Sequence, residues 1–393
     1  MSRRLSFLLA ALTIASPALA QRDLGTVEVS ADNRTIPVRV SGSTQELNAL
    51  AVQAFSAHGR YRVVASGYNF DIKFSPAGPS QVRVDIDRRF GGSLGSQVAS
   101  GATQREALLA AADIAVEKTN GMGLRGFFTS KLVFIGERTG HKEVYTSDLF
   151  FGNVREITHD RAIAMTPRWS PDGERILYTS FFRSGFPDIF QIDTTDYQRT
   201  VFASFKGTNS GARFSPDGRQ VAMVLSGEGE TEIYVSNAQG TGVSRRTRSD
   251  TTKASPCWSP DGSRLIFAME PGPQLYVMSA GGGTPQRVTL GTAGYCAEPD
   301  WSRTNPDKVA FTMKAGSYQI GVLSLSSRHG EQVSHADFDG IEPSWLPDGR
   351  HLVYTARSPS RSRLCILDTE TGKSTSISPS SFGSTLQANV WSR

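Results

Sequence analysis

Short apolar runs separated by polar turns fill the chain from about residue 130 to its last residues. Residues 265–269 (LIFAM) and 275–278 (LYVM) are two such runs, and Gly, Pro, Asp and Ser cluster between them. Runs of this length between turn-forming residues predict short strands rather than helices. Four runs follow one another in each stretch of about 40–45 residues, so the pattern predicts a series of four-stranded antiparallel meanders.

A phrase built on Trp-Ser-Pro-Asp-Gly opens each of these meanders. It stands, whole or in part, at residues 169–173, 214–218, 258–262, 301–307, 345–349 and 391–392. Pro-Asp-Gly suits a tight turn, and the tryptophan before it is expected to pack between neighbouring meanders. A tryptophan mark at this period is typical of a β-propeller.

The two ends of the repeat array complement each other. Residues 132–135, 144–146 and 155–158 read as second, third and fourth strands with no phrase ahead of them. The last phrase, at Trp391, is a first strand with nothing after it. Joining them predicts six blades, with the C-terminal strand closing the first blade and removing the exposed sheet edges.

Residues 21–128 lack the repeat and predict a small α+β domain. Capping patterns at Ser43 and Thr103 predict helices that end near Gly59 and Asn120. Alternating apolar residues predict strands over 27–40, 61–64, 70–74 and 82–86. The fold class is therefore a multidomain chain, α+β at the N-terminus and then an all-β six-bladed propeller over 129–393.

The first twenty residues have the features of a secretory signal peptide. Arg3 and Arg4 precede a short apolar run, and Ala18-Leu19-Ala20 predicts cleavage after Ala20. The run is too short to span a bilayer, so we expect an exported protein whose mature form is not held in the membrane by this segment. The formal charge of +5 has no Lys/Arg run behind it, which makes nucleic acid a poor partner.

Candidate catalytic chemistry is sparse. Residues 91–95 match G-x-S-x-G, but in so small a domain a flexible Gly/Ser loop is the expected structure. The six histidines show no metal-binding spacing, and no nucleotide fingerprint is present. We therefore expect no catalytic residue, metal or cofactor. Three cysteines leave at least one thiol unpaired, and whether Cys257 and Cys296 form a bridge stays open.

The segments that lead into the first strands ring one mouth of the predicted channel. They mix apolar residues with polar ones and with two carboxylates, Glu298 and Glu342, each ahead of a proline. Apolar side chains within a polar rim suit protein recognition. The alternative is that both glutamates are solvated loop residues.

The chain resembles the TolB family, the periplasmic component of the Tol–Pal cell-envelope system. The resemblance covers nearly the whole chain and rests on its domain order and on four stretches. These are residues 117–121 with 126–128, 282–289, 298–301 and 342–345.

The resemblance implies a monomeric, non-catalytic periplasmic adaptor that supports outer-membrane integrity and envelope constriction at cell division. The family binds the lipoprotein Pal at the propeller mouth and TolA through its N-terminal segment, although residues 22–40 here lack the family's apolar run. By motif position the Pal-facing residues are Met165, Thr208, Asn209, Lys253, Ala297, Glu298 and Glu342. The alternative function is a periplasmic propeller enzyme or a sugar- or peptide-binding module, which should gather histidines and carboxylates at the mouth.

Overall fold

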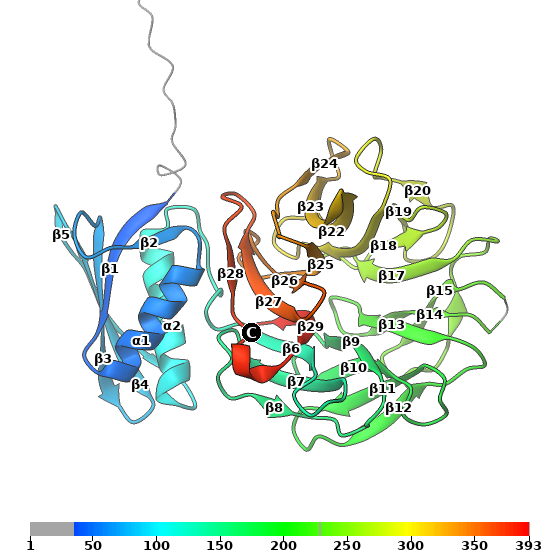
Figure 1. Cartoon of the computed structure of the whole chain (residues 1–393), viewed down its shortest axis with the longest axis horizontal. Helices are drawn as coiled ribbons and strands as arrows, with labels where there is room; N and C mark the ends of the chain where they lie inside the picture. Colours follow the sequence, from blue (N-terminus) through cyan, green and yellow to red (C-terminus); the bar gives the residue numbers. More distant parts are fainter. Residues whose placement is uncertain (1–34, 228, 393) are drawn as a thin grey trace, which may run out of the picture.

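The N-terminal part of the chain forms a five-stranded sheet covered by two helices (Figure 1). The computed structural model describes residues 35–227 and 229–392, so the predicted signal peptide, Ala20, Val27 and Val29 lie outside the described residues. The strand order is β2-β1-β3-β4-β5. The bounds are β1 Ile36–Gly42, α1 Gln45–Ala57, β2 Tyr61–Val63, β3 Phe70–Gly78, β4 Gln81–Arg88, β5 Gly92–Ser100 and α2 Gln104–Thr119.

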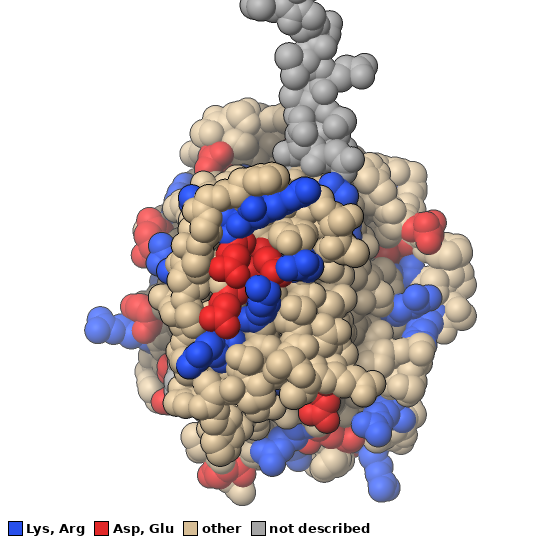
Figure 2. All heavy atoms as spheres, turned by 90° about the vertical axis from the view of Figure 1, so that its left-hand side faces the viewer, with Lys and Arg blue, Asp and Glu red and all other residues tan. Residues whose placement is uncertain are grey.

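One face of this sheet is apolar and the other is charged. Val38, Ile72 and Val84 are fully buried on the face that packs against both helices. On the opposite face, where Figure 2 shows charged side chains gathered, Lys73 Nζ lies 3.3 Å from a carboxylate oxygen of Asp87 on the neighbouring strand. Such exposed cross-strand pairs contribute little stability, and this surface reads as a solvated sheet face.

Two local expectations in this unit need correction. Helix α1 is capped by Thr44, whose hydroxyl accepts from the Leu47 N–H at 3.3 Å, so the helix begins one residue later than the pattern at Ser43 suggested. The G-x-S-x-G run was expected as a flexible loop, but residues 92–95 of it lie in strand β5 and pair with β4. Pairing in the sheet satisfies its backbone groups. No helix follows it directly, as a nucleophile elbow would require.

Six four-stranded antiparallel sheets surround a central axis and form the propeller, confirming the predicted fold class (Figure 1). The first three blades are β9 Ala164–Trp169, β10 Arg175–Ser180, β11 Asp188–Asp193 and β12 Arg199–Ala203; β13 Asn209–Phe214, β14 Gln220–Leu225, β15 Glu232–Asn237 and β16 Ser244–Arg245; and β17 Lys253–Trp258, β18 Arg264–Met269, β19 Gln274–Ser279 and β20 Gln286–Arg287. The fourth and fifth are β21 Cys296–Trp301, β22 Lys308–Ala315, β23 Ser317–Ser324 and β24 His329–Gln332; and β25 Asp339–Trp345, β26 His351–Arg357, β27 Ser362–Asp368 and β28 Ser374–Ser376.

The sixth blade takes its strands from both ends of the array, as predicted. Its order is β29-β6-β7-β8, with β29 Thr385–Trp391, β6 Lys131–Gly136, β7 Glu143–Asp148 and β8 Arg155–Glu156. Strand β29 is innermost, and its Val390 is paired with Leu132 of β6. A 3-10 turn, Ser380–Phe382, leads into β29. The predicted boundary at 128/129 falls between α2 and β6.

The repeated phrase is scaffold. In the third blade the Ser259 hydroxyl donates to Asp261 at 2.5 Å, which fixes the turn. The Trp258 indole N–H donates to the Arg213 carbonyl of the preceding blade at 2.9 Å, and Trp345 makes the same bond to Asp300. The tryptophans therefore pack between blades, as expected. All three cysteines are buried and free, which settles the open question of a bridge.

Candidate functional site

Six residues, one from each innermost strand, form a ring inside the channel. All have positive φ, between 51° and 62°, and each lies at an irregularity in the pairing of its strand. Together they line one cavity of about 60 Å³. The members of this ring are Thr166, Gly211, Ser255, Glu298, Glu342 and Gln387. Only Glu298 and Glu342 were predicted from the sequence as site residues. The Trp-Ser-Pro-Asp-Gly phrase does not indicate that the other four residues have a left-handed backbone.

Hydrogen bonds link consecutive members of the ring from blade to blade. A carboxylate oxygen of Glu298 accepts from the Glu342 N–H at 3.1 Å. Glu342 in turn accepts from the Gln387 side-chain amide at 2.8 Å, and Gln387 accepts from the Thr166 N–H at 2.8 Å. Side chain to backbone bonds of this kind fix the spacing of neighbouring blades.

The ionisation of Glu298 in the ring is shifted by its surroundings. Burial, and then the charge of Glu342, raise the pKa of Glu298 to about 7. The Thr312 hydroxyl donates to Glu298 at 2.6 Å and partly opposes the shift. Glu298 is therefore only partly ionised near neutral pH. Both glutamates accept hydrogen bonds from the backbone of the next blade, so neither is an ordinary solvated loop residue.

Several predicted mouth residues lie at the expected end of the blades but are engaged inside the protein. Asn209 is fully buried, and its side chain bonds the backbone of Phe205, Gly207 and Pro187. Lys253 is 1% exposed and lies 3.0 Å from Glu232. Ala297 is buried too.

The remaining predicted residues reach solvent at least in part. Met165, Thr208, Glu298 and Glu342 are partly exposed. The structure thus divides the predicted set into residues that could touch a partner and residues that hold the mouth loops in place. Whether any of them contacts Pal stays a prediction.

Exposed apolar side chains surround the mouth, and sequence reasoning missed them. In an antiparallel blade the loops between strands two and three and those into strand one lie at the same end. These loops carry large apolar residues at 46–68% exposure: Ile163, Phe182, Phe186, Phe205, Leu290 and Phe338. Their signal was an aromatic or aliphatic residue within an otherwise polar turn. Grouped on one face, they are typical of a protein-docking surface.

The N-terminal unit packs against the opposite end of the blades. Arg105 of α2 pairs with Asp148 at the far end of β7 at 2.5 Å, and Lys373 Nζ donates to the Ser56 carbonyl at 2.7 Å. Among the described residues, these contacts are made by the loops that lie away from the mouth. The mouth face is therefore left uncovered by the rest of the described chain.

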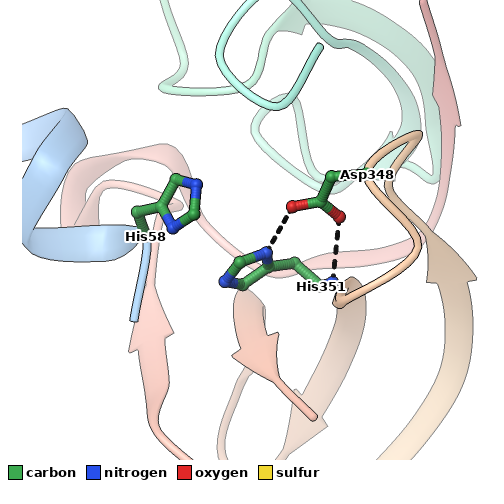
Figure 3. Close-up of side chains that lie close together, drawn as sticks. All are labelled: His58, Asp348 and His351. Atoms are coloured by element: carbon green, nitrogen blue, oxygen red, sulfur yellow. Dashed lines mark hydrogen bonds and ion pairs between the residues drawn. The ribbon is translucent and has the colours of Figure 1, made fainter. Parts of the chain in front are cut away.

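A cluster of two histidines and one aspartate lies at this junction (Figure 3). His58 comes from the end of α1, and Asp348 and His351 come from the fifth blade. Within the described ranges theirs is the one group of three such side chains whose possible ligand atoms lie within 4.8 Å of one another. The His58 and His351 rings meet edge to face at 4.5 Å.

The side chains of this cluster are better suited to packing the N-terminal unit against the propeller than to binding a metal ion. Asp348 Oδ2 lies 2.5 Å from His351 Nδ1, and Oδ1 accepts from the His351 N–H at 3.0 Å, so both oxygens are engaged. Arg350, paired with Asp368 at 2.6 Å, adds a positive charge that would oppose a cation. We therefore treat the cluster as part of the junction.

Six closed blades around a polar channel, with a small α+β unit at one end, define a propeller of the kind that presents a binding face. The chain belongs to the TolB beta propeller domain family, whose model matches residues 119–393.

Relatives of known name agree with this membership. A protein TolB homolog of Chlorobium luteolum is 33% identical over 166 residues, 41% of this chain and 37% of its own length. The Tol-Pal system protein TolB of Desulfosudis oleivorans is 38% identical over 127 residues, 32% of this chain and 28% of its own length. The matched stretches thus span about a third of those relatives.

A solved structure matches more of the chain at the level of fold. The crystal structure of TolB from Acinetobacter baumannii has a TM-score of 0.79 and 20% identity, and the match covers 91% of this chain and 96% of that one. Within the described ranges, neither helix has the length and apolar character needed to cross a membrane.

Proposed function

We propose that this chain is a periplasmic, non-catalytic adaptor of a Tol–Pal system that docks the lipoprotein Pal on its propeller mouth. The observation that carries the proposal is the uncovered mouth face, where exposed apolar side chains surround a polar ring. Phe186 is 68% exposed and Phe338 is 54% exposed, on loops of different blades. Apolar anchors around a polar centre are the usual composition of a protein interface.

The channel lining favours binding over catalysis. Among the described residues, neither channel cavity is lined by a histidine. The ring carboxylates are committed to bonds with the neighbouring backbone. An enzyme of the alternative class would need a free acid or base aimed at a substrate.

The test is capture of the purified periplasmic part of Pal from the same organism. We expect Phe186→Ala with Phe338→Ala to weaken capture by roughly tenfold or more, because buried aromatic anchors dominate such interfaces. Phe90→Ala is the matched control, since Phe90 is 82% exposed on the N-terminal unit. Equal capture by the double variant and by the control would overturn the proposed surface.

We further propose that the N-terminal segment contacts TolA. The support is family membership, because residues 22–34 lie outside the described structure. Deleting residues 22–33 should abolish TolA capture and leave Pal capture unchanged. Unchanged TolA capture by the deletion variant would reject this contact.

A further inference from the structure

Beneath the ring, two arginine side chains face the channel without a partner. Arg168 and Arg303 line a cavity of about 110 Å³. In the described part of the chain, neither guanidinium makes a hydrogen bond or an ion pair. Arg168 is half-buried and Arg303 is exposed. Two unpaired guanidiniums that line one cavity leave their N–H donors available to an anion.

The carboxylate nearest to them is already engaged. Asp300 Oδ1 accepts from a third arginine of the cavity, Arg213, at 2.7 Å. Its Oδ2 accepts from the Trp345 N–H at 2.7 Å. Among the residues that the structure describes, three guanidiniums and one carboxylate line this cavity, and that carboxylate is shared between Arg213 and the Trp345 N–H.

Burial and a neighbouring positive charge both act on Arg168. Burial, and then the charge of Arg213, lower the pKa of Arg168 to about 10. Arg168 stays protonated at neutral pH, and so does Arg303, which solvent reaches. Glu298 and Glu342 in the ring above offset part of the charge, but less than fully because Glu298 has a pKa of about 7.

The sequence places these arginines by departing from the repeat. Arg303 stands where the complete phrases have their proline, in the degenerate fourth copy. Arg168 and Arg213 each lie directly before the aromatic residue of their phrase, a position held by Cys257 in the third blade. The scaffold role of the phrase requires none of these three cations, so their convergence indicates a role of its own.

We propose that this cavity binds a small divalent oxyanion of the sulfate or phosphate class between the guanidiniums of Arg168, Arg213 and Arg303. Guanidinium groups present paired N–H donors that match the oxygens of such an anion. A cavity of about 110 Å³ has room for one tetrahedral oxyanion with water. The anion would neutralise the excess charge at the centre of the propeller and stabilise the closed ring.

The test is titration of the purified protein with sodium sulfate at constant ionic strength, followed by calorimetry. We expect saturable binding that Arg168→Gln and Arg303→Gln each weaken by roughly tenfold or more, because each removes a charged donor. Arg219→Gln is the matched control, since Arg219 is exposed on a turn and removes the same charge. Phosphate as a second probe should behave in the same way.

A second measurement separates binding from folding. Without sulfate, Arg168→Gln should be at least as stable as the wild type, because it removes an uncompensated charge. Sulfate also stabilises proteins in general by exclusion from their surface, but that effect is common to all variants. No saturable sulfate binding by the wild type, or equal binding by the Arg168 and Arg219 variants, would overturn the proposal.

Discussion

The side-chain oxygen of Gln387 accepts a hydrogen bond from the backbone N–H of Thr166 at 2.8 Å, across 221 positions of the chain. Gln387 lies on the closing strand β29 and Thr166 on the first strand of the next blade. The amide of the same side chain donates to Glu342 Oε1 at 2.8 Å. One residue thus joins three successive blades at the point where the ring closes.

Replacing Gln387 should loosen this closure. We expect Gln387→Ala to lower the free energy of unfolding by about 1–3 kcal/mol, since it leaves the Thr166 N–H and one Glu342 oxygen without partners. Chemical denaturation measures the change. Gln97→Ala, at an exposed position on β5, is the control and should change little. Similar small losses in both variants would show that the bond does not hold the ring.

The ring glutamates predict a stability that depends on pH. Because the pKa of Glu298 is raised to about 7 in the folded protein, its contribution to stability is fully present below its usual pKa of 4.5 and is lost as the pH rises through 7. Glu298→Gln should therefore be more stable than the wild type at pH 8, on the order of 2 kcal/mol. The advantage should vanish near pH 4.5.

Glutamine suits this experiment because both bonds to Glu298 end on one oxygen. Thr312 and the Glu342 N–H each donate to Oε2, and an amide oxygen can accept both. Thermal melts of both proteins across this pH range give the comparison. A constant difference between them would mean that Glu298 does not titrate near pH 7.

Replacing Asn209 shows whether this residue contacts Pal directly or stabilises the fold of the mouth loop. Its amide donates to the Phe205 carbonyl at 2.8 Å, and its oxygen accepts from the Phe205 N–H at 2.8 Å. Asn209→Ala should cost about 2–4 kcal/mol in unfolding free energy because it leaves several buried groups unpaired. Loss of Pal capture with an unchanged melting temperature would instead make Asn209 a contact residue.

Burial of His58 between the N-terminal unit and the propeller predicts that acid weakens the contact between them. Burial, and then the neighbouring His351, lower the pKa of His58 well below 6.5. Its stabilising contribution is therefore present above pH 6.5 and lost as the pH falls below it, by about 1.4 kcal/mol per unit. His58→Phe should remove this loss, because the ring contacts Phe127 at 4.4 Å and both its nitrogens lack partners among the described residues.

The comparison is between pH 7 and pH 5.5 by thermal denaturation. Asp348, Arg350 and Asp368 face the same cluster and are present in both proteins, so the difference isolates His58. His329→Gln, at an exposed position, is the control and should follow the wild type. An equal pH response of His58→Phe and the wild type would contradict the prediction.

The repeat made the propeller predictable, and the blade count and closure followed from it. The tryptophan and the Pro-Asp-Gly turn recur because each blade needs the same packing and the same turn. The packing of Trp258 and Trp345 between blades could therefore be predicted from the sequence. The N-terminal helices were found from their caps for the same reason. Residues 91–95 were misjudged because glycine-rich sequence allows a loop and a strand alike, and pairing with β4 decides between them.

The site could be predicted only in part. Glu298 and Glu342 were visible as a repeated Glu-Pro, but the ring that they belong to depends on a backbone conformation that Thr166 and Gln387 share without a common residue type. The burial of Asn209 and Lys253 depends on bonds to loops elsewhere in the chain. The exposed phenylalanines could not be told from core residues until the blades placed them at one end.

The pairing of Val390 with Leu132 means that the closing blade cannot be completed until long after its outer strands are synthesised. The outer strands of the closing blade are synthesised first, and their inner partner follows more than 250 positions later in the chain. At about 5–20 residues per second, the interval is on the order of 10–50 s. During it β6 has no partner on its inner edge, and an unpaired strand edge of this kind is prone to aggregation.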